Sequence, residues 1–136
     1  MLLAINLCDA QVVNIPDKTK SGFAEKYPKA TDVKWSNNVS NYTAKFKQKG
    51  KDYVAHYNVD GTWDNTETKI DNDDIPKDAR ESFSKSRYAD WQLTSTDFVE
   101  DHKGQSLYRF NLKKGIEKKY LYLDKTGKEI KSSSGL

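Results

Sequence analysis

The sequence predicts an α+β protein built from two tandem repeats, each an N-terminal helix packed on an antiparallel sheet of about four strands. Three observations predict this class. Landmark residues recur in the same order about 60 positions apart, helical periodicity opens each repeat, and a two-residue alternation of apolar and polar side chains follows each helix. With 136 residues, the chain is long enough to bury a hydrophobic interior.

The internal repeat is seen in short motifs of the first half of the chain that recur, in the same order, in the second half. Ile15-Pro16 recurs as Ile75-Pro76, Phe23 as Phe83, Lys49-Gly50 as Lys114-Gly115, and the turn 58–61 as 124–127. Chance could supply one such pair but hardly the ordered set. We therefore divide the chain into a first repeat at 11–72 and a second repeat at 73–136.

Each repeat is expected to open with a helix. Proline is favoured in a first helical turn, where its missing N–H has no intrahelical partner to lose. Apolar residues then follow at helical spacing and give each helix one narrow apolar stripe. These residues are Ile15, Thr19, Phe23 and Tyr27 in the first repeat and Ile75, Ala79 and Phe83 in the second. Pro28 ends the first helix, because the residue before a proline is pushed out of the helical region.

Half-buried antiparallel strands are expected after each helix, because apolar and polar side chains alternate there. The alternating apolar residues are Val33 and Trp35, then Tyr42, Ala44 and Phe46, then Tyr53, Ala55, Tyr57 and Val59, with counterparts from Leu93 to Leu123. Asn58 to Gly61 and Asp124 to Gly127 both have the residues of a type I turn followed by a left-handed glycine. That turn would place Tyr57 opposite Trp63 on the sheet.

The N-terminus differs in composition from the rest of the chain. An apolar stretch at 2–7 and the small residues around Cys8 indicate that residues 1–10 are the remnant of a secretory signal peptide. The alternative is an apolar first strand that packs on the domain. Cys8 is the only cysteine, so a chain cut after Ala10 would contain no disulfide. This pattern predicts a periplasmic or secreted location.

Several of these residues together resemble a known family. Phe23, Tyr27-Pro28, Ala30, Val33, Trp35 and later Asp60-Gly61-Thr62-Trp63 are similar to the PepSY-like, beta-lactamase-inhibitor-like periplasmic proteins of Bacteroidetes. The resemblance runs from about Ile15 to Ile130. It implies a helix on a sheet of about four strands in each repeat, and export to the periplasm or cell surface. The inhibitor label describes the fold and brings no established target. The second repeat departs from the pattern, because no proline follows Tyr88.

Catalytic and metal-binding patterns are missing from the sequence. There is no glycine-rich phosphate loop and no Gly-x-Ser-x-Gly elbow. His56 and His102 fall in different repeats and are expected to be ordinary strand or loop residues. Calcium is disfavoured, since Asn58 and Asp60 are already required by the turn. We therefore predict no enzyme, no catalytic residue, no cofactor and no metal.

The net charge of +3 comes from 23 basic and 20 acidic residues that are scattered together. A surface that follows phosphates needs clustered basic residues, so nucleic acid is not an expected partner. No apolar run approaches the length of a membrane span.

One strand carries large apolar groups on both faces, although a helix can cover only one. This strand is 119–123, and its second face needs a cover from the other repeat, a homodimer partner or a bound protein. We take Trp63, Trp91, Tyr120 and Tyr122 as a candidate partner-binding surface, with a core shared between the repeats as the alternative. The predicted function is a non-enzymatic exported protein-binding module, inhibitor-like or envelope-associated, whose protein partner is unidentified. The competing function is a small-molecule or metal-binding periplasmic protein, or an enzyme with an unrecognised site.

Overall fold

In the computed structural model, which describes residues 13–131, seven strands form one antiparallel sheet in the order β1-β2-β3-β4-β5-β6-β7. The α+β class and the antiparallel sheet are confirmed. The elements are α1 (Asp17–Lys26), β1 (Thr31–Asn37), β2 (Asn41–Gln48), β3 (Lys51–Asn58), β4 (Trp63–Ile70), the 3-10 turn η1 (Asn72–Asp74), α2 (Lys77–Ser84), β5 (Gln92–Asp101), β6 (Ser106–Lys114) and β7 (Glu117–Leu123). Residues 1–10 and Cys8, for which a signal peptide was predicted, lie outside the described residues.

Both helices form where the sequence predicts them. Pro16 and Pro76 cap α1 and α2, and α1 ends at Lys26, just before Tyr27-Pro28. The apolar stripe of α1 is buried through Thr19 and Phe23, and that of α2 through Ala79. Neither helix in residues 13–131 has the length and hydropathy that a membrane span requires.

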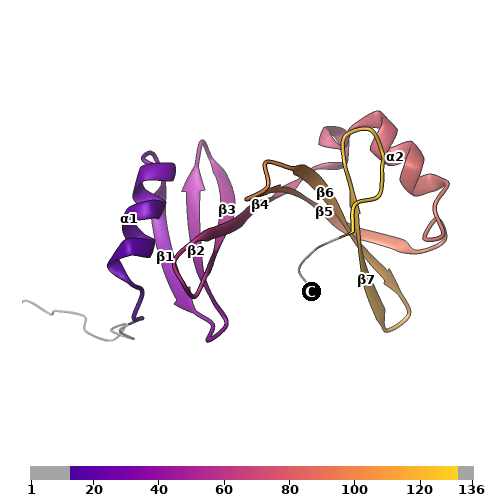
Figure 1. Cartoon of the computed structure of the whole chain (residues 1–136). Helices are drawn as coiled ribbons and strands as arrows, with labels where there is room; N and C mark the ends of the chain where they lie inside the picture. The colour runs from indigo at the N-terminus through magenta and orange to yellow at the C-terminus, as the bar shows by residue number, and fades with distance from the viewer. Residues whose placement is uncertain (1–12, 132–136) are drawn as a thin grey trace, which may run out of the picture.

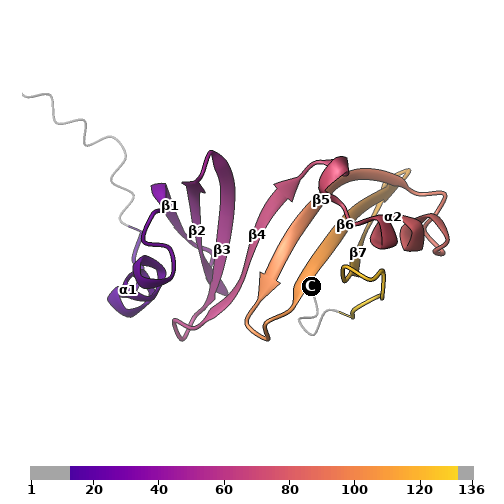
Figure 2. The same ribbon diagram turned by 90° about the horizontal axis from the view of Figure 1, so that it is seen from above.

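The two helices lie at opposite ends of the sheet, α1 beside β1–β3 and α2 beside β5–β7 (Figures 1 and 2). Residues directly opposite each other in neighbouring strands point to the same face. Ala55 faces Thr66, and Thr96 faces Phe110, so the face covered by α1 continues across β4 and β5 to the face covered by α2. Both helices therefore cover one face of the sheet.

Each helix covers its own hydrophobic cluster. Under α1 the buried residues are Phe23, Ala44, Phe46, Ala55 and Tyr57, and under α2 they are Ile75, Ala79, Phe110, Leu112, Leu121 and Leu123. Aromatic rings fix both contacts: the Phe23 and Phe46 centroids are 5.1 Å apart edge to face, and those of Phe83 and Phe110 are 5.3 Å apart and stacked. Such pairs add stability beyond the area they bury.

The sheet is continuous, and its second half contributes three strands where about four were expected. β4 pairs directly with β5, and after β7 only an isolated bridge between Leu123 and Glu129 marks the place of a further strand. The reason is the turn that follows β7. Ser82 Oγ donates to the carbonyl oxygen of Gly127 at 2.5 Å, and Arg87 binds Glu129 at 2.9 Å. The segment 124–129 is therefore held against α2 and the loop that follows α2. The duplication of one repeat stays a prediction.

The two predicted glycine turns are confirmed. Gly61 and Gly127 have φ of 90° and 87°, and each N–H binds the carbonyl oxygen three residues earlier. Tyr57 pairs with Trp63 across the first turn, as the loop length predicts. At Gly127 an added Cβ would lie 2.6 Å from the carbonyl oxygen of Asp78, so this turn also needs glycine for its contact with α2.

Candidate functional site

The face of the sheet opposite the helices, here called the open face, presents mainly polar and charged side chains. Its members follow from strand alternation and register. They are Lys34, Ser36, Thr43, Lys45, Lys47, Asp52, Val54, His56, Asn65, Glu67, Lys69, Ser95, Asp97, Val99, Leu107, Arg109, Asn111, Lys113, Lys118, Tyr120 and Tyr122. No helix within residues 13–131 covers this face, so it is the surface on which a partner or ligand has room.

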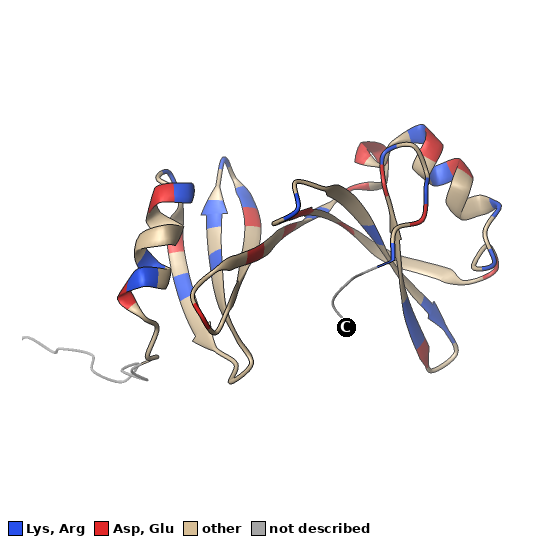
Figure 3. Ribbon diagram, in the orientation of Figure 1, with Lys and Arg blue, Asp and Glu red and all other residues tan. Residues whose placement is uncertain are grey.

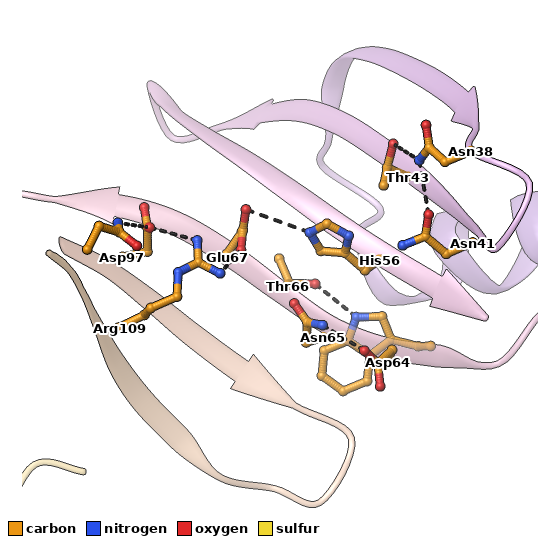
Figure 4. A network of polar contacts seen from close by, with 12 residues as sticks. Asn38, Asn41, Thr43, His56, Asp64, Asn65, Thr66, Glu67, Asp97 and Arg109 are labelled. Atoms are coloured by element: carbon orange, nitrogen blue, oxygen red, sulfur yellow. Dashed lines mark hydrogen bonds and ion pairs between the residues drawn. The ribbon is translucent and has the colours of Figure 1, made fainter. Parts of the chain in front are cut away.

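A chain of polar contacts runs across the middle of the open face (Figure 4). His56 Nε2 lies 3.7 Å from Glu67 Oε1, and Glu67 Oε2 lies 2.8 Å from Arg109 Nη1. Arg109 Nη2 then donates to Asp97 Oδ2 at 2.7 Å, and Asn111 Nδ2 donates to the same oxygen at 2.7 Å. The chain therefore joins β3, β4, β5 and β6, and it crosses the β4–β5 pairing between the two halves.

The environment of this chain favours the charged forms of Glu67 and Arg109. The four ionisable side chains are only 16% to 24% exposed. Burial raises the pKa of Glu67, but the nearby His56 imidazole and the charge and close contact of Arg109 outweigh it, so the pKa of this carboxyl lies below its ordinary value. Burial likewise pulls down the pKa of Arg109, and the carboxylates of Glu67 and Asp97 more than restore it. The arginine is thus held between the side chains of Glu67 and Asp97.

A second histidine pair lies at the edge of the open face. His102 Nδ1 is 3.2 Å from Asp64 Oδ1, and the backbone N–H of His102 donates to the Asp64 carbonyl oxygen at 2.8 Å. His56 and His102, which the sequence places in different repeats, both line one shallow depression of about 320 Å³ that Leu107 also lines. Within residues 13–131, no three side chains of His, Cys, Asp or Glu gather in a way that could hold a metal ion.

The four aromatic residues predicted as a partner surface are divided by the structure. Trp63 lies in the first cluster, where its Nε1 donates to Thr66 Oγ1 at 2.9 Å and Lys26 Nζ lies 3.8 Å from the ring centroid. Trp91 packs at the second cluster. Only Tyr120 and Tyr122 come together, on the β7 end of the open face, where the residue Tyr120 is 56% exposed.

The central polar chain is the part of the candidate site that sequence reasoning missed. Its members occupy polar positions of alternating strands, so a sequence signal existed for the face on which they lie. What the sequence lacked was the pairing of β4 with β5, which is joined through a whole helix and is therefore fixed by no local turn. Without that register, Glu67 cannot be matched to Asp97 and Arg109.

Comparisons with known proteins identify the architecture. No protein-family model matches the sequence, and no curated protein matches it significantly. Among solved structures, a DUF2874 family protein from Bacteroides ovatus is 27% identical, with a TM-score of 0.74 over 87% of this chain and 86% of that one. A BLIP-like protein from Bacteroides fragilis is 20% identical, with a TM-score of 0.75 over 91% of this chain and 89% of that one.

The chain has the fold of these BLIP-like Bacteroides proteins. A third structure, of a Bacteroides eggerthii protein described as periplasmic, is 21% identical and gives a TM-score of 0.73 over 87% of both chains. The resemblance on which the sequence analysis relied is thereby confirmed at the level of the fold. Because these neighbours cover almost the same length, the likeness includes both helices and the sheet.

Proposed function

We propose that the protein is a non-enzymatic module of the periplasm or cell surface that binds another protein on its open face. The observation that carries the proposal is one continuous face of seven strands without a covering helix in residues 13–131. The fold shared with the BLIP-like protein and with a neighbour described as periplasmic supports both the binding role and the location.

The size of the open face suits a protein partner. Seven strands span six spacings of about 4.8 Å, or about 29 Å, and strands of eight residues are about 26 Å long. This corresponds to roughly 750 Å², close to the area of about 800 Å² that each partner contributes to a standard interface. A small ligand would occupy only a part of it.

The chemistry of the central polar chain favours binding over catalysis. A general base needs a pKa near the working pH, whereas the pKa of Glu67 is lowered and its carboxylate is engaged by Arg109. Arg109 is engaged in turn by Asp97. These groups hold one another in place and form a rigid polar centre for an interface.

We further propose that the fold arose by tandem duplication of the 11–72 and 73–136 repeats. Each half has one helix over its own buried cluster, which supports this origin. On this hypothesis the open face is composite, because both repeats contribute strands to it. A partner that spans the face would contact both.

The test is a pull-down from an envelope fraction with the tagged protein, followed by mass spectrometry. Tyr120→Ser removes an exposed aromatic ring from the open face. Val59→Ser is the matched control, because Val59 is also 56% exposed but lies in the β3–β4 turn. We expect one stoichiometric protein with the wild type and the control, and at least tenfold less with Tyr120→Ser, since exposed aromatic residues often dominate interfaces. No protein partner, together with a rise in melting temperature caused by a low-mass envelope fraction, would favour the small-molecule alternative.

A further inference from the structure

Two pairs of lysines face each other across neighbouring strands, one at each end of the open face. Lys34 lies opposite Lys45 in the β1–β2 pairing, and Lys113 lies opposite Lys118 in the β6–β7 pairing. All four residues are exposed. Figure 3 shows basic residues on β1 and β2 at one end of the sheet and along the β6–β7 hairpin at the other.

The lysine pairs differ from the other basic residues of this face in what lies opposite them. Lys47 and Lys69 each lie opposite an aspartate, Asp52 and Asp97. Like charges directly opposite each other destabilise a sheet. Arg109 is compensated by Glu67 and Asp97, whereas neither lysine pair forms an ion pair with any residue in 13–131. In the centre of the open face, basic side chains therefore lie opposite or beside acidic ones, whereas each end has two lysines that face each other.

We propose that the open face recognises an acidic protein surface, with one cluster of carboxylates bound by each lysine pair. This inference rests on the proposed function and adds the chemistry of the partner. Two ammonium groups on adjacent strands, whose backbones are about 4.8 Å apart, can both reach one carboxylate cluster. Binding would remove the repulsion within each pair, so the arrangement that weakens the free protein favours the complex.

The spacing of the pairs argues for a folded protein as the occupant. Five strand spacings, about 24 Å, separate the β1–β2 pair from the β6–β7 pair across the sheet. The register places Lys45 level with Leu107, six residues from Lys113, which adds about 20 Å along the strands and gives a separation of about 31 Å. That span is longer than a small metabolite. A polyanion such as nucleic acid would also have to cross the carboxylates of Glu67 and Asp97, which repel it. A second copy of this chain presents the same lysines and would be repelled face to face.

The probe for this proposal is a peptide with two Asp-Glu-Asp-Glu blocks joined by a flexible Gly-Ser linker of about 32 residues, whose root-mean-square length of about 31 Å matches the span. A peptide with a single Asp-Glu-Asp-Glu block serves as the comparison. Binding to the full chain is measured by fluorescence anisotropy at about 20 mM salt, where electrostatic attraction is least screened. We expect the two-block peptide to bind at least tenfold more tightly than the one-block peptide.

The variants separate the two anchor points. Lys34→Gln with Lys45→Gln, and separately Lys113→Gln with Lys118→Gln, should each reduce the two-block affinity to that of the one-block peptide. The matched control is Lys20→Gln with Lys85→Gln, which removes the same charge from α1 and from the end of α2 and should stay within twofold of the wild type. Unchanged or higher melting temperatures of the lysine-pair variants show that they are folded.

Three results would overturn the inference. They are equal binding of both peptides, an equal loss in the control, and tighter lysine-dependent binding to duplex DNA or to anionic vesicles than to the two-block peptide. The proposed function can fail separately. If the envelope partner is captured equally by the lysine-pair variants, the inference is wrong and the binding module stands, whereas the absence of any protein partner contradicts the module itself.

Discussion

Replacing Arg109 with methionine should lower the free energy of unfolding by about 2–4 kcal/mol at pH 7. The substitution keeps most of the aliphatic stem and removes the guanidinium that binds Glu67 at 2.8 Å and Asp97 at 2.7 Å. Removing one partner from a buried ion pair costs about 3–5 kcal/mol, because an uncompensated charge remains in a poorly solvated place. The lower range reflects the partial exposure of these carboxylates, 22% and 16%.

The pH dependence of this effect has a definite sign. In the wild type, the folded pKa of Glu67 is lower than its unfolded value of about 4.3, so its pairing contributes stability above that value. This contribution is lost as the pH falls through the folded pKa. In Arg109→Met the favourable charge of Arg109 is gone, so burial raises the pKa of Glu67. Protonation of Glu67 then removes its buried charge and lowers the cost of the substitution. The difference between the two proteins should therefore be largest near pH 7 and shrink toward pH 4.

The assay is urea unfolding of the wild type, Arg109→Met, Glu67→Gln and the double variant at both pH values. The double-mutant cycle isolates the coupling between the two side chains. Arg87→Met is the matched control, because Arg87 also forms two hydrogen bonds to a carboxylate, that of Glu129, but at an exposed site. Exposed pairs contribute little to stability, because water and salt screen them. Equal costs at Arg87 and Arg109, or a cost at Arg109 that does not change with pH, would refute the reasoning.

The remaining predictions concern two residue types in the cores and turns. Tyr57→Phe should leave stability unchanged or raise it by about 1 kcal/mol, because the hydroxyl is buried without a hydrogen-bond partner among the described residues. Burial, with the nearby Tyr27, raises the pKa of Tyr57 to about 12, so the wild type should lose stability between about pH 10 and 12 and the variant should lose less; equal alkaline unfolding curves would contradict this. Gly127→Ala should cost about 3 kcal/mol or more in thermal unfolding, because its Cβ would meet the Asp78 carbonyl oxygen, and Gly61→Ala should cost only about 1–2 kcal/mol, because its nearest contact is Thr19 Oγ1 at 3.1 Å. Similar costs at the two glycines would show that the contact with α2 is unimportant.

Local patterns were sufficient for the elements that depend on neighbouring residues. The stripe from Thr19 to Phe23 and the proline at position 28 predict α1, and the glycine at position 61 predicts both the turn and the Tyr57–Trp63 pair. Each of these depends on a backbone preference or a side-chain period that acts over fewer than ten residues. The same patterns predict which strand positions face the helices.

The parts that the sequence left open depend on contacts between distant segments. The β4–β5 register aligns Glu67 with Val99 and Lys69 with Asp97, and it is this alignment that creates the central polar chain. The expected fourth strand of the second repeat was lost to a competing contact between Gly127 and α2. Aromatic content alone could not tell a ring in a core, such as Trp91, from a ring on the open face, such as Tyr120.

The central polar chain and the lysine pairs have complementary roles in the proposed interface. Each half of the protein has its own hydrophobic cluster, so the clusters fix the strands within a half and do not by themselves fix one half against the other. The β4–β5 pairing makes that connection, and on the open face Arg109 of β6 reaches across β5 to Glu67 of β4. Since the lysine pairs lie on opposite sides of this junction, the rigidity of the junction sets their separation. A partner that must contact both pairs at once therefore depends on side chains that it need not touch.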